Sequence, residues 1–212
     1  MQSVVESTTN FSQHTTFPHT VQQASEVEMR NLDQLLDVST KILTQALDLL
    51  DNSLSSDEQL LYNSKFLPGS TIGKHLRHAR DHFALLLDSA SSPAPHVLSY
   101  DVRLRNTPME SCRQAAREAI TATIAKLEKT VPSSRLDAPL TLNAVTPYDQ
   151  TFQSTFGREL WFAGLHAVHH WSMIRVIAGE LGIQLEDTFG FAPSTLVYKG
   201  AEGPLGKGKP KM

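Results

Sequence analysis

Six of the nine histidines in this 212-residue sequence fall in two short segments that lie far apart in the chain. The first segment, residues 71–83, contains His75, His78 and His82, and the second, residues 165–171, contains His166, His169 and His170. Imidazole titrates near neutral pH and is a common ligand for zinc, nickel, copper and iron. Histidines from both segments that point at one ion would bind it and leave coordination positions open. The pattern therefore predicts a metal site.

The second segment contains the better chelating pair. If residues 155–181 form a helix, His166 and His170 lie about 40° apart on its apolar stripe, because successive residues are rotated by about 100°. Side chains at i and i+4 occupy successive turns of one face, so both rings can reach the same ion. His169 lies roughly 60° to the other side of His166. We therefore expect His166 and His170 to be ligands and His169 to lie on the flank.

The first segment offers three candidates for a third ligand. On a helix, His75, His78 and His82 all line one edge of the apolar face, and the spacing alone does not identify which of them meets the pair. A single buried histidine is more often structural than a ligand. Two converging groups without a shared ligand would, however, carry repeated costs of polar burial. A site of three histidines is therefore the favoured interpretation.

Four stretches have the apolar or Ala-rich spacing and the end signals of helices, namely residues 21–54, 72–90, 108–129 and 155–181. Thr71 is a natural N-cap for the second stretch, Pro108 a first-turn residue for the third, and Gly182 a C-cap for the fourth. Residues 136–151 contain prolines and a short apolar alternation, which predicts a loop with at most a short extended piece. Together these elements predict an all-α fold, an antiparallel four-helix bundle, in which sites are built from facing helices.

The composition divides the chain into a bundle with two tails. Residues 1–20 are rich in Ser, Thr, Gln and His, which predicts a disordered arm, because such a segment buries too little apolar surface to offset its ordering entropy. Residues 21–199 form the predicted bundle and include an irregular C-terminal segment, 189–195, that is expected to dock on it or to serve as a lid. Residues 200–212 are rich in Gly and Lys and predict a disordered tail.

Charge and cysteine usage limit the class of partner. The sequence has 19 basic and 22 acidic side chains, a formal charge of −3, and no long run of either sign, which disfavours nucleic acid as a partner.

No apolar run is long enough for a membrane span, and the first residues lack a secretion signal. A single cysteine, Cys112, fits a reducing compartment. We expect a cytoplasmic protein with a small-molecule substrate and no membrane partner; a homodimer is possible.

Five motifs in order resemble the DinB/YfiT-like family, over residues 32–198. They are Thr71-Ile72-Gly73-x-His75-x-x-His78-x-x-Asp81-His82-Phe83, Tyr100-Asp101-x-Arg103-x-Arg105, Gly157-Arg158-Glu159-Leu160, His166-x-x-His169-His170 and Phe189-Gly190-x-Ala192-Pro193-Ser194-Thr195. The resemblance implies a four-helix bundle that binds a divalent metal, zinc or nickel, through one histidine of the second helix and the i, i+4 pair of the last. On this chain the implied ligands are His78, His166 and His170.

The resemblance supplies a site rather than a reaction. The family includes thiol transferases and a thiol-dependent isomerase, in which the metal is thought to activate a low-molecular-weight thiol, and many members without an assigned reaction. Three neutral imidazoles leave the charge of the ion in place and acidify a bound water or thiol. We therefore expect a metal-dependent enzyme that acts on a small electrophile by transfer or hydrolysis, with a low-molecular-weight thiol as possible cosubstrate.

The alternative is a stress-associated protein that binds a metal or a small molecule without turnover. A fourth ligand from His75 or His82 would close the coordination sphere and favour that alternative. In an open three-ligand site, the remaining histidines are expected to hydrogen-bond to the ligands or to line the pocket; these are His75, His82 and His169.

Two further features have a chemical and a structural interpretation. Glu159 lies one heptad before His166 and roughly 10 Å along the helix axis. It can accept a hydrogen bond from a residue of the site, act as a catalytic base, or form an ion pair with Arg103, Arg105 or Lys74. The loop that follows the second helix can bind an anionic substrate or be fixed by ion pairs, through Tyr100, Asp101, Arg103 and Arg105.

Overall fold

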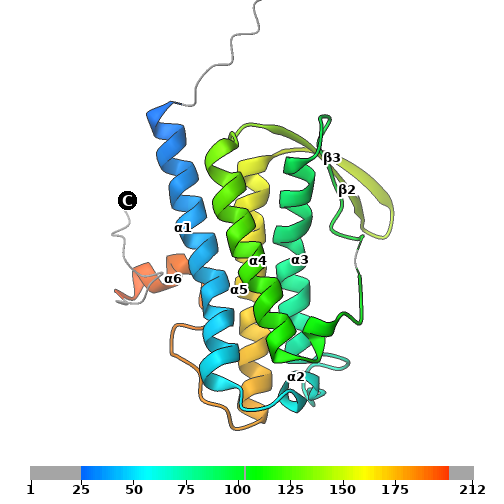
Figure 1. The fold of residues 1–212 in the computed structure, drawn as a ribbon, viewed down its shortest axis with the longest axis vertical. Coiled ribbons are helices and arrows are strands. Elements are labelled where there is room, and N and C mark those ends of the chain that lie inside the picture. Colours follow the sequence, from blue (N-terminus) through cyan, green and yellow to red (C-terminus); the bar gives the residue numbers. More distant parts are fainter. Residues whose placement is uncertain (1–24, 103, 201–212) are drawn as a thin grey trace, which may run out of the picture.

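The computed structural model describes residues 25–102 and 104–200. Four long helices lie side by side along the longest axis of the molecule (Figure 1), namely α1 (Glu26–Asp48), α3 (Ile72–Ser91), α4 (Arg113–Thr130) and α5 (Phe156–Glu180). A π-helical turn (Leu49–Ser53) follows α1, and the one-turn helix α2 (Glu58–Leu61) lies in the connection to α3. The predicted arm at residues 1–20 and the predicted tail after residue 200 lie outside the described residues.

Hydroxyl side chains cap three of the long helices at their first turn. The bonds run from the backbone N–H to the capping oxygen and measure 3.2 Å for Glu28 to Ser25, 3.2 Å for Lys74 to Thr71 and 3.3 Å for Arg158 to Thr155. Each satisfies a backbone N–H that has no partner inside its helix. The predicted cap at Thr71 is confirmed.

The prediction of an all-α four-helix bundle is wrong, because the chain also forms a three-stranded mixed sheet. β2 (Pro139–Val145) and β3 (Asp149–Thr155) form an antiparallel hairpin, and β1 (Val97–Leu98) pairs in parallel with β2. The hairpin lies at one end of the bundle, where β3 leads directly into α5 (Figure 1). The side chains of β3 are mostly polar and exposed. The strand therefore lacks the apolar alternation from which strands are predicted.

The third long helix begins later than predicted. Pro108–Glu110 form a separate 3-10 turn, and Ser111, with φ −131° and ψ −7°, interrupts the helical path before α4. The Glu110 carboxylate accepts from the backbone N–H of Thr107 at 3.3 Å and forms a 2.9 Å ion pair with Arg77 of α3. The ion pair fixes the 3-10 turn against α3, separately from α4.

The C-terminal segment docks on the bundle, and it is not wholly irregular because Pro193–Tyr198 form a short helix, α6. Arg175 Nε donates to the carbonyl of Phe189 at 2.9 Å, and Ser172 Oγ donates to that of Gly190 at 2.6 Å. Phe189 is buried, and its ring centroid lies 6.1 Å from that of Trp171. These contacts support docking against Trp171 rather than a lid.

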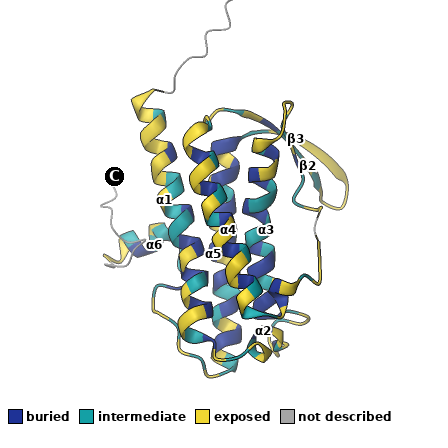
Figure 2. Cartoon of the chain, in the orientation of Figure 1, coloured by how far each residue is buried: buried dark blue, intermediate teal, exposed yellow. Residues whose placement is uncertain are grey.

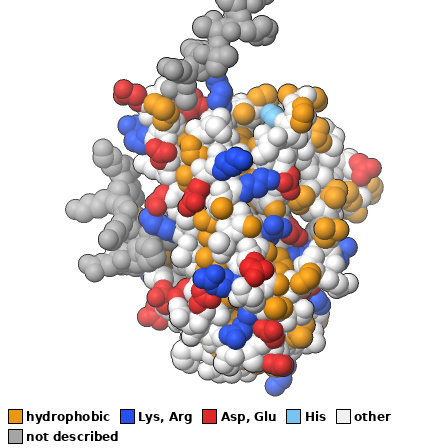
Figure 3. All heavy atoms as spheres, viewed as in Figure 1, with side chains coloured by type: hydrophobic (Ala, Val, Ile, Leu, Met, Phe, Trp, Pro, Cys, Tyr) orange, Lys and Arg blue, Asp and Glu red, His pale blue; other side chains and the backbone are white. Residues whose placement is uncertain are grey.

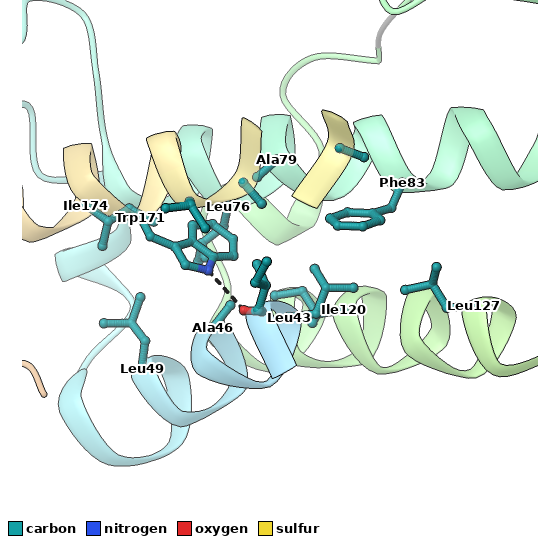
Figure 4. Close-up of a cluster of buried hydrophobic side chains, with 14 of the residues drawn as sticks. Leu43, Ala46, Leu49, Leu76, Ala79, Phe83, Ile120, Leu127, Trp171 and Ile174 are labelled. Atoms are coloured by element: carbon teal, nitrogen blue, oxygen red, sulfur yellow. Dashed lines mark hydrogen bonds between the residues drawn. The ribbon is translucent and has the colours of Figure 1, made fainter. Parts of the chain in front are cut away.

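Aliphatic and aromatic side chains fill the space between the helices, whose inward faces are buried along most of their length (Figure 2). Trp171 of α5 is fully buried and donates its Nε1–H to the carbonyl of Ile42 in α1 at 3.0 Å. Figure 4 shows residues of all four long helices near this bond, among them Leu43, Leu76, Phe83 and Ile120. Burial of each such side chain contributes roughly 1.5–3 kcal/mol, so this core is the main source of stability.

The surface carries charges of both signs. On the face shown in Figure 3, basic and acidic side chains are interspersed, and some pair between elements, as Arg117 does with Asp51 at 3.0 Å. Exposed pairs of this kind contribute about 0–1 kcal/mol each. Within the described part of the chain, no helix is both long and apolar enough to cross a membrane.

Gly73 fixes the approach of the 3-10 turn to α3, which gives a test of the fold. A Cβ at this position would lie 2.0 Å from the carbonyl oxygen of Glu110, a backbone atom that cannot rotate away. We predict that Gly73→Ala lowers the free energy of unfolding by roughly 1–3 kcal/mol or more, measured by urea denaturation.

Gly179→Ala is the matched control, because a Cβ at Gly179 meets nothing within 4 Å and the residue lies in the last turn of α5. This substitution should leave stability unchanged or raise it by up to about 1 kcal/mol. Equal effects of the two substitutions would contradict the close approach at Gly73.

Candidate metal centre

The packing of α3 against α5 brings the two histidine segments together. His166 Nε2 lies 3.1 Å from His78 Nε2 of α3 and 3.1 Å from His170 Nε2, one turn further along α5. The rings meet edge to face, with interplanar angles of 69° for His78 and His166, 72° for His166 and His170, and 84° for His78 and His170. The three Nε2 atoms thus gather around that of His166.

These separations suit a divalent ion. Two imidazole nitrogens bound at about 2.0–2.1 Å lie roughly 2.9 Å apart at right angles and roughly 3.3 Å apart at tetrahedral angles. Both 3.1 Å separations fall between these values. The same separations suit N–H···N hydrogen bonds between neutral rings. His166 Nε2 has only one proton or one lone pair, however, so it can form a full hydrogen bond with only one of the two rings. The residues therefore fit a metal better than they satisfy one another.

His82 is a fourth imidazole at this place. One ligand atom from each of His78, His82 and His166 lies within 4.8 Å of the others. His82 Nδ1 donates to the carbonyl of His78 at 2.9 Å, and the His82 ring lies between two others, with centroids 3.9 Å from His166 at 32° and 4.5 Å from Tyr100 at 16°. The contact with His166 is thus tilted, whereas the contact with Tyr100 is a parallel stack. His82 is therefore an alternative to His170 as the third ligand.

His75 contacts the opposite edge of the His170 ring, with 2.7 Å between the two Nδ1 atoms. Burial lowers the pKa of His75 to about 4, and the neighbouring His169 acts in the same direction. Burial, followed by the nearby His166 and His78, lowers the pKa of His170 to about 2. Both rings are thus neutral at neutral pH, the form that a metal ligand requires.

The other predicted residues take different places. His169 is exposed on the flank of α5, as expected, with its ring centroid 5.2 Å from that of His170. Arg105 is exposed in the loop after β1, and Arg103 lies outside the described residues. The structure thus brings His75, His78, His82, His166 and His170 together, and the choice of ligands among them stays a prediction.

Glu159 is 1% exposed, and both of its carboxylate oxygens accept hydrogen bonds. Ser154 Oγ donates to one oxygen at 2.6 Å, and the Tyr100 hydroxyl donates to the other at 2.9 Å. Burial, reinforced by the negative charge of Glu159, raises the pKa of Tyr100 above its ordinary value, so the phenol remains a donor. Lys74, an expected partner of Glu159, instead donates to the carbonyl of Gly69 at 2.8 Å.

The structure therefore places Glu159 where it holds Tyr100 against His82. A role for Glu159 as a catalytic base stays a prediction.

Two aromatic residues belong to the site, and the sequence offered a role for only one of them. Phe162, which was given no role, lies one turn before His166, with ring centroids 5.5 Å apart and an interplanar angle of 30°. Its i, i+4 spacing from His166 is a signal that would have identified it. Tyr100 belongs to the loop predicted either to bind an anion or to be fixed by ion pairs, and it reaches the site through its bond to Glu159.

Comparison with known proteins assigns the family. The family model described as the DinB superfamily matches residues 35–174. The chain belongs to the DinB superfamily. This DinB-superfamily chain is also similar to a curated protein of Rhizopus delemar named FK506-binding protein 5, at 37% identity over 170 residues. That match covers 77% of this chain and spans 37% of the length of the relative. No solved structure matches.

The neutral state of His75 and His170 predicts how the stability of the metal-free DinB-superfamily chain depends on pH. Each pKa is lower in the folded chain than its ordinary value of about 6.5, so the unfolded chain takes up more protons as the pH falls. The free energy of unfolding contributed by these groups is present above about pH 6.5 and should decrease as the pH falls towards about 4. Urea denaturation in the presence of a chelator measures this decrease.

His170→Gln removes one of the two titrating groups. Its free energy of unfolding should fall less steeply over the same pH range, because glutamine binds no proton there. A pH dependence identical to that of the parent would show that His170 is not held neutral by burial.

Proposed function

We propose that this protein binds one divalent metal ion, zinc or nickel, through His78, His166 and His170 and uses it to activate a small nucleophile. The observation that supports the proposal is the position of His166 Nε2, 3.1 Å from the Nε2 atoms of both other residues. Membership of the DinB superfamily and the cluster of histidines agree with a divalent metal.

The three residues would supply neutral nitrogen ligands and no negative charge. An ion so held keeps its full charge and lowers the pKa of a bound water or thiol towards neutrality. The protein contributes position, because the packing of α3 on α5 holds the Nε2 atoms of His78 and His170 each 3.1 Å from that of His166. The Tyr100 and Phe162 rings pack against His82 and His166 and limit how these rings can turn.

The proposed substrate is a small electrophile, and the reaction is transfer of a low-molecular-weight thiol or hydrolysis. The half-buried aromatic side chains beside the histidines, Tyr100 and Phe162, favour a small molecule that is partly apolar. Cys112 is a free thiol, which agrees with a reducing compartment, and we propose the cytoplasm.

A second candidate function rests on the presence of His82 in the cluster. If His82 also binds the ion, four imidazoles complete a tetrahedral sphere and the metal has a structural role. The 3.1 Å separations of His166 Nε2 from the Nε2 atoms of His78 and His170 favour the open three-ligand site.

Metal analysis tests the ligand set. The parent protein should contain about one divalent ion per chain, and the His78→Ala, His166→Ala and His170→Ala variants should contain little or none. His169→Ala is the control and should retain the metal, because His169 is exposed on the flank of α5. Circular dichroism of each variant checks that it is folded. Full metal content in the His170→Ala variant would contradict the proposed ligand set.

His82→Phe separates the two candidate functions, because phenylalanine preserves a ring between Tyr100 and His166 and removes the nitrogen ligands. We predict that this variant retains the metal. The cobalt-substituted parent should change its visible absorption when a thiol such as glutathione is added, and it should consume the thiol with an activated electrophile. Loss of metal in the variant, together with a spectrum insensitive to thiol, would favour a closed structural site.

A further inference from the structure

We infer that His75 is a positioning residue for the metal centre: its Nδ1 accepts a hydrogen bond from the Nδ1–H of His170 and so directs the Nε2 lone pair of His170 towards the ion. The inference rests on the proposed function, and it adds a residue that the ligand set does not contain. The contact on which it depends is the 2.7 Å separation of the two Nδ1 atoms.

The chemistry of imidazole restricts where the protons can be. A neutral imidazole carries one N–H and one lone pair, so one of two contacting nitrogens must donate and the other must accept. If His170 Nε2 binds a metal, its single proton is on Nδ1, and His75 Nδ1 must be the acceptor. Of the two arrangements possible for this pair, only one therefore permits His170 to be a ligand.

The neutral form of His75 is the one that can accept. A protonated imidazole has two donors and no acceptor, and would repel both the Nδ1–H of His170 and the ion. When Nδ1 of the neutral ring accepts, its single proton is on Nε2, an atom that is buried and has no hydrogen-bond partner among the described residues.

An imidazole acceptor differs from the partners that metal-binding histidines commonly have, which are carboxylates, backbone carbonyls and water. Both buried carboxylates of the described residues have other partners: Glu159 accepts from Ser154 and Tyr100, and Glu110 pairs with Arg77. A carboxylate partner would add negative charge to the ligand, whereas His75 fixes the tautomer and adds none. The centre then keeps the full positive charge on which activation of a nucleophile depends.

Two substitutions of His75 test the inference. Asparagine retains a carbonyl oxygen close to the position of Nδ1, and leucine fills similar space without an acceptor. We expect the His75→Leu variant to bind zinc roughly 10- to 100-fold more weakly than the parent, measured by competition with a chromophoric chelator, and the His75→Asn variant to retain most of the affinity. The visible spectrum of the cobalt-substituted protein should change with leucine and resemble that of the parent with asparagine.

Unchanged affinity in the leucine variant, or an equal loss in both variants, would overturn the inference. Thermal unfolding of the metal-free variants is the control. A variant that unfolds at a much lower temperature than the parent has lost affinity because it has lost its fold.

A measurement that needs no metal distinguishes failure of this inference from failure of the proposed function. In the metal-free protein with 15N-labelled histidine, NMR should detect a coupling across the hydrogen bond between the Nδ1 atoms of His75 and His170. Absence of that coupling overturns the inference even if the parent binds metal. Presence of the coupling in a parent that binds no metal removes the proposed function and, with it, the role of His75 in that function.

Discussion

The burial of several imidazoles between α3 and α5 is the constraint on which the rest of this structure depends. Each ring brings polar atoms into a helix contact that is otherwise apolar, and such atoms destabilise the fold unless they find partners. The rings meet this requirement in part through one another, although His75 Nε2 is buried without a hydrogen-bond partner among the described residues. His75 contacts His170, His170 contacts His166, and His166 contacts His78.

The elements around the histidines serve this contact. Thr71 begins α3 and Thr155 begins α5, and each cap fixes where the turns that carry the histidines start. The 3-10 turn before α4 is held on α3 by the ion pair of Glu110 with Arg77. Tyr100, in the loop after β1, stacks on His82 of α3 and donates to Glu159 of α5. The hairpin acts on the site indirectly. Ser154 of β3 donates to the Glu159 carboxylate, which in turn orients Tyr100.

Sequence patterns predicted the long helices and the grouping of histidines, because both follow from periodic spacing. The choice of the third ligand among His75, His78 and His82 could not be predicted, because all three lie on one edge of α3 and the direction of each ring nitrogen depends on its rotamer. The hairpin was missed because β3 has almost no buried side chains. Tyr100 depends on contacts between residues 59 positions apart in the chain, which leave no local pattern.

The bond from the Trp171 indole to the carbonyl of Ile42 has a consequence for the centre. Trp171 directly follows His170, so the turn of α5 that carries this histidine is tied to α1, a helix that contributes no histidine to the cluster. Contacts with α3 and with α1 thus both fix the position of α5, and with it the spacing of the imidazoles. To suit an ion of another radius, α5 would have to slide along its axis and break the buried Trp171 bond. Discrimination between metals would then depend partly on α1, at a distance from any coordinating atom.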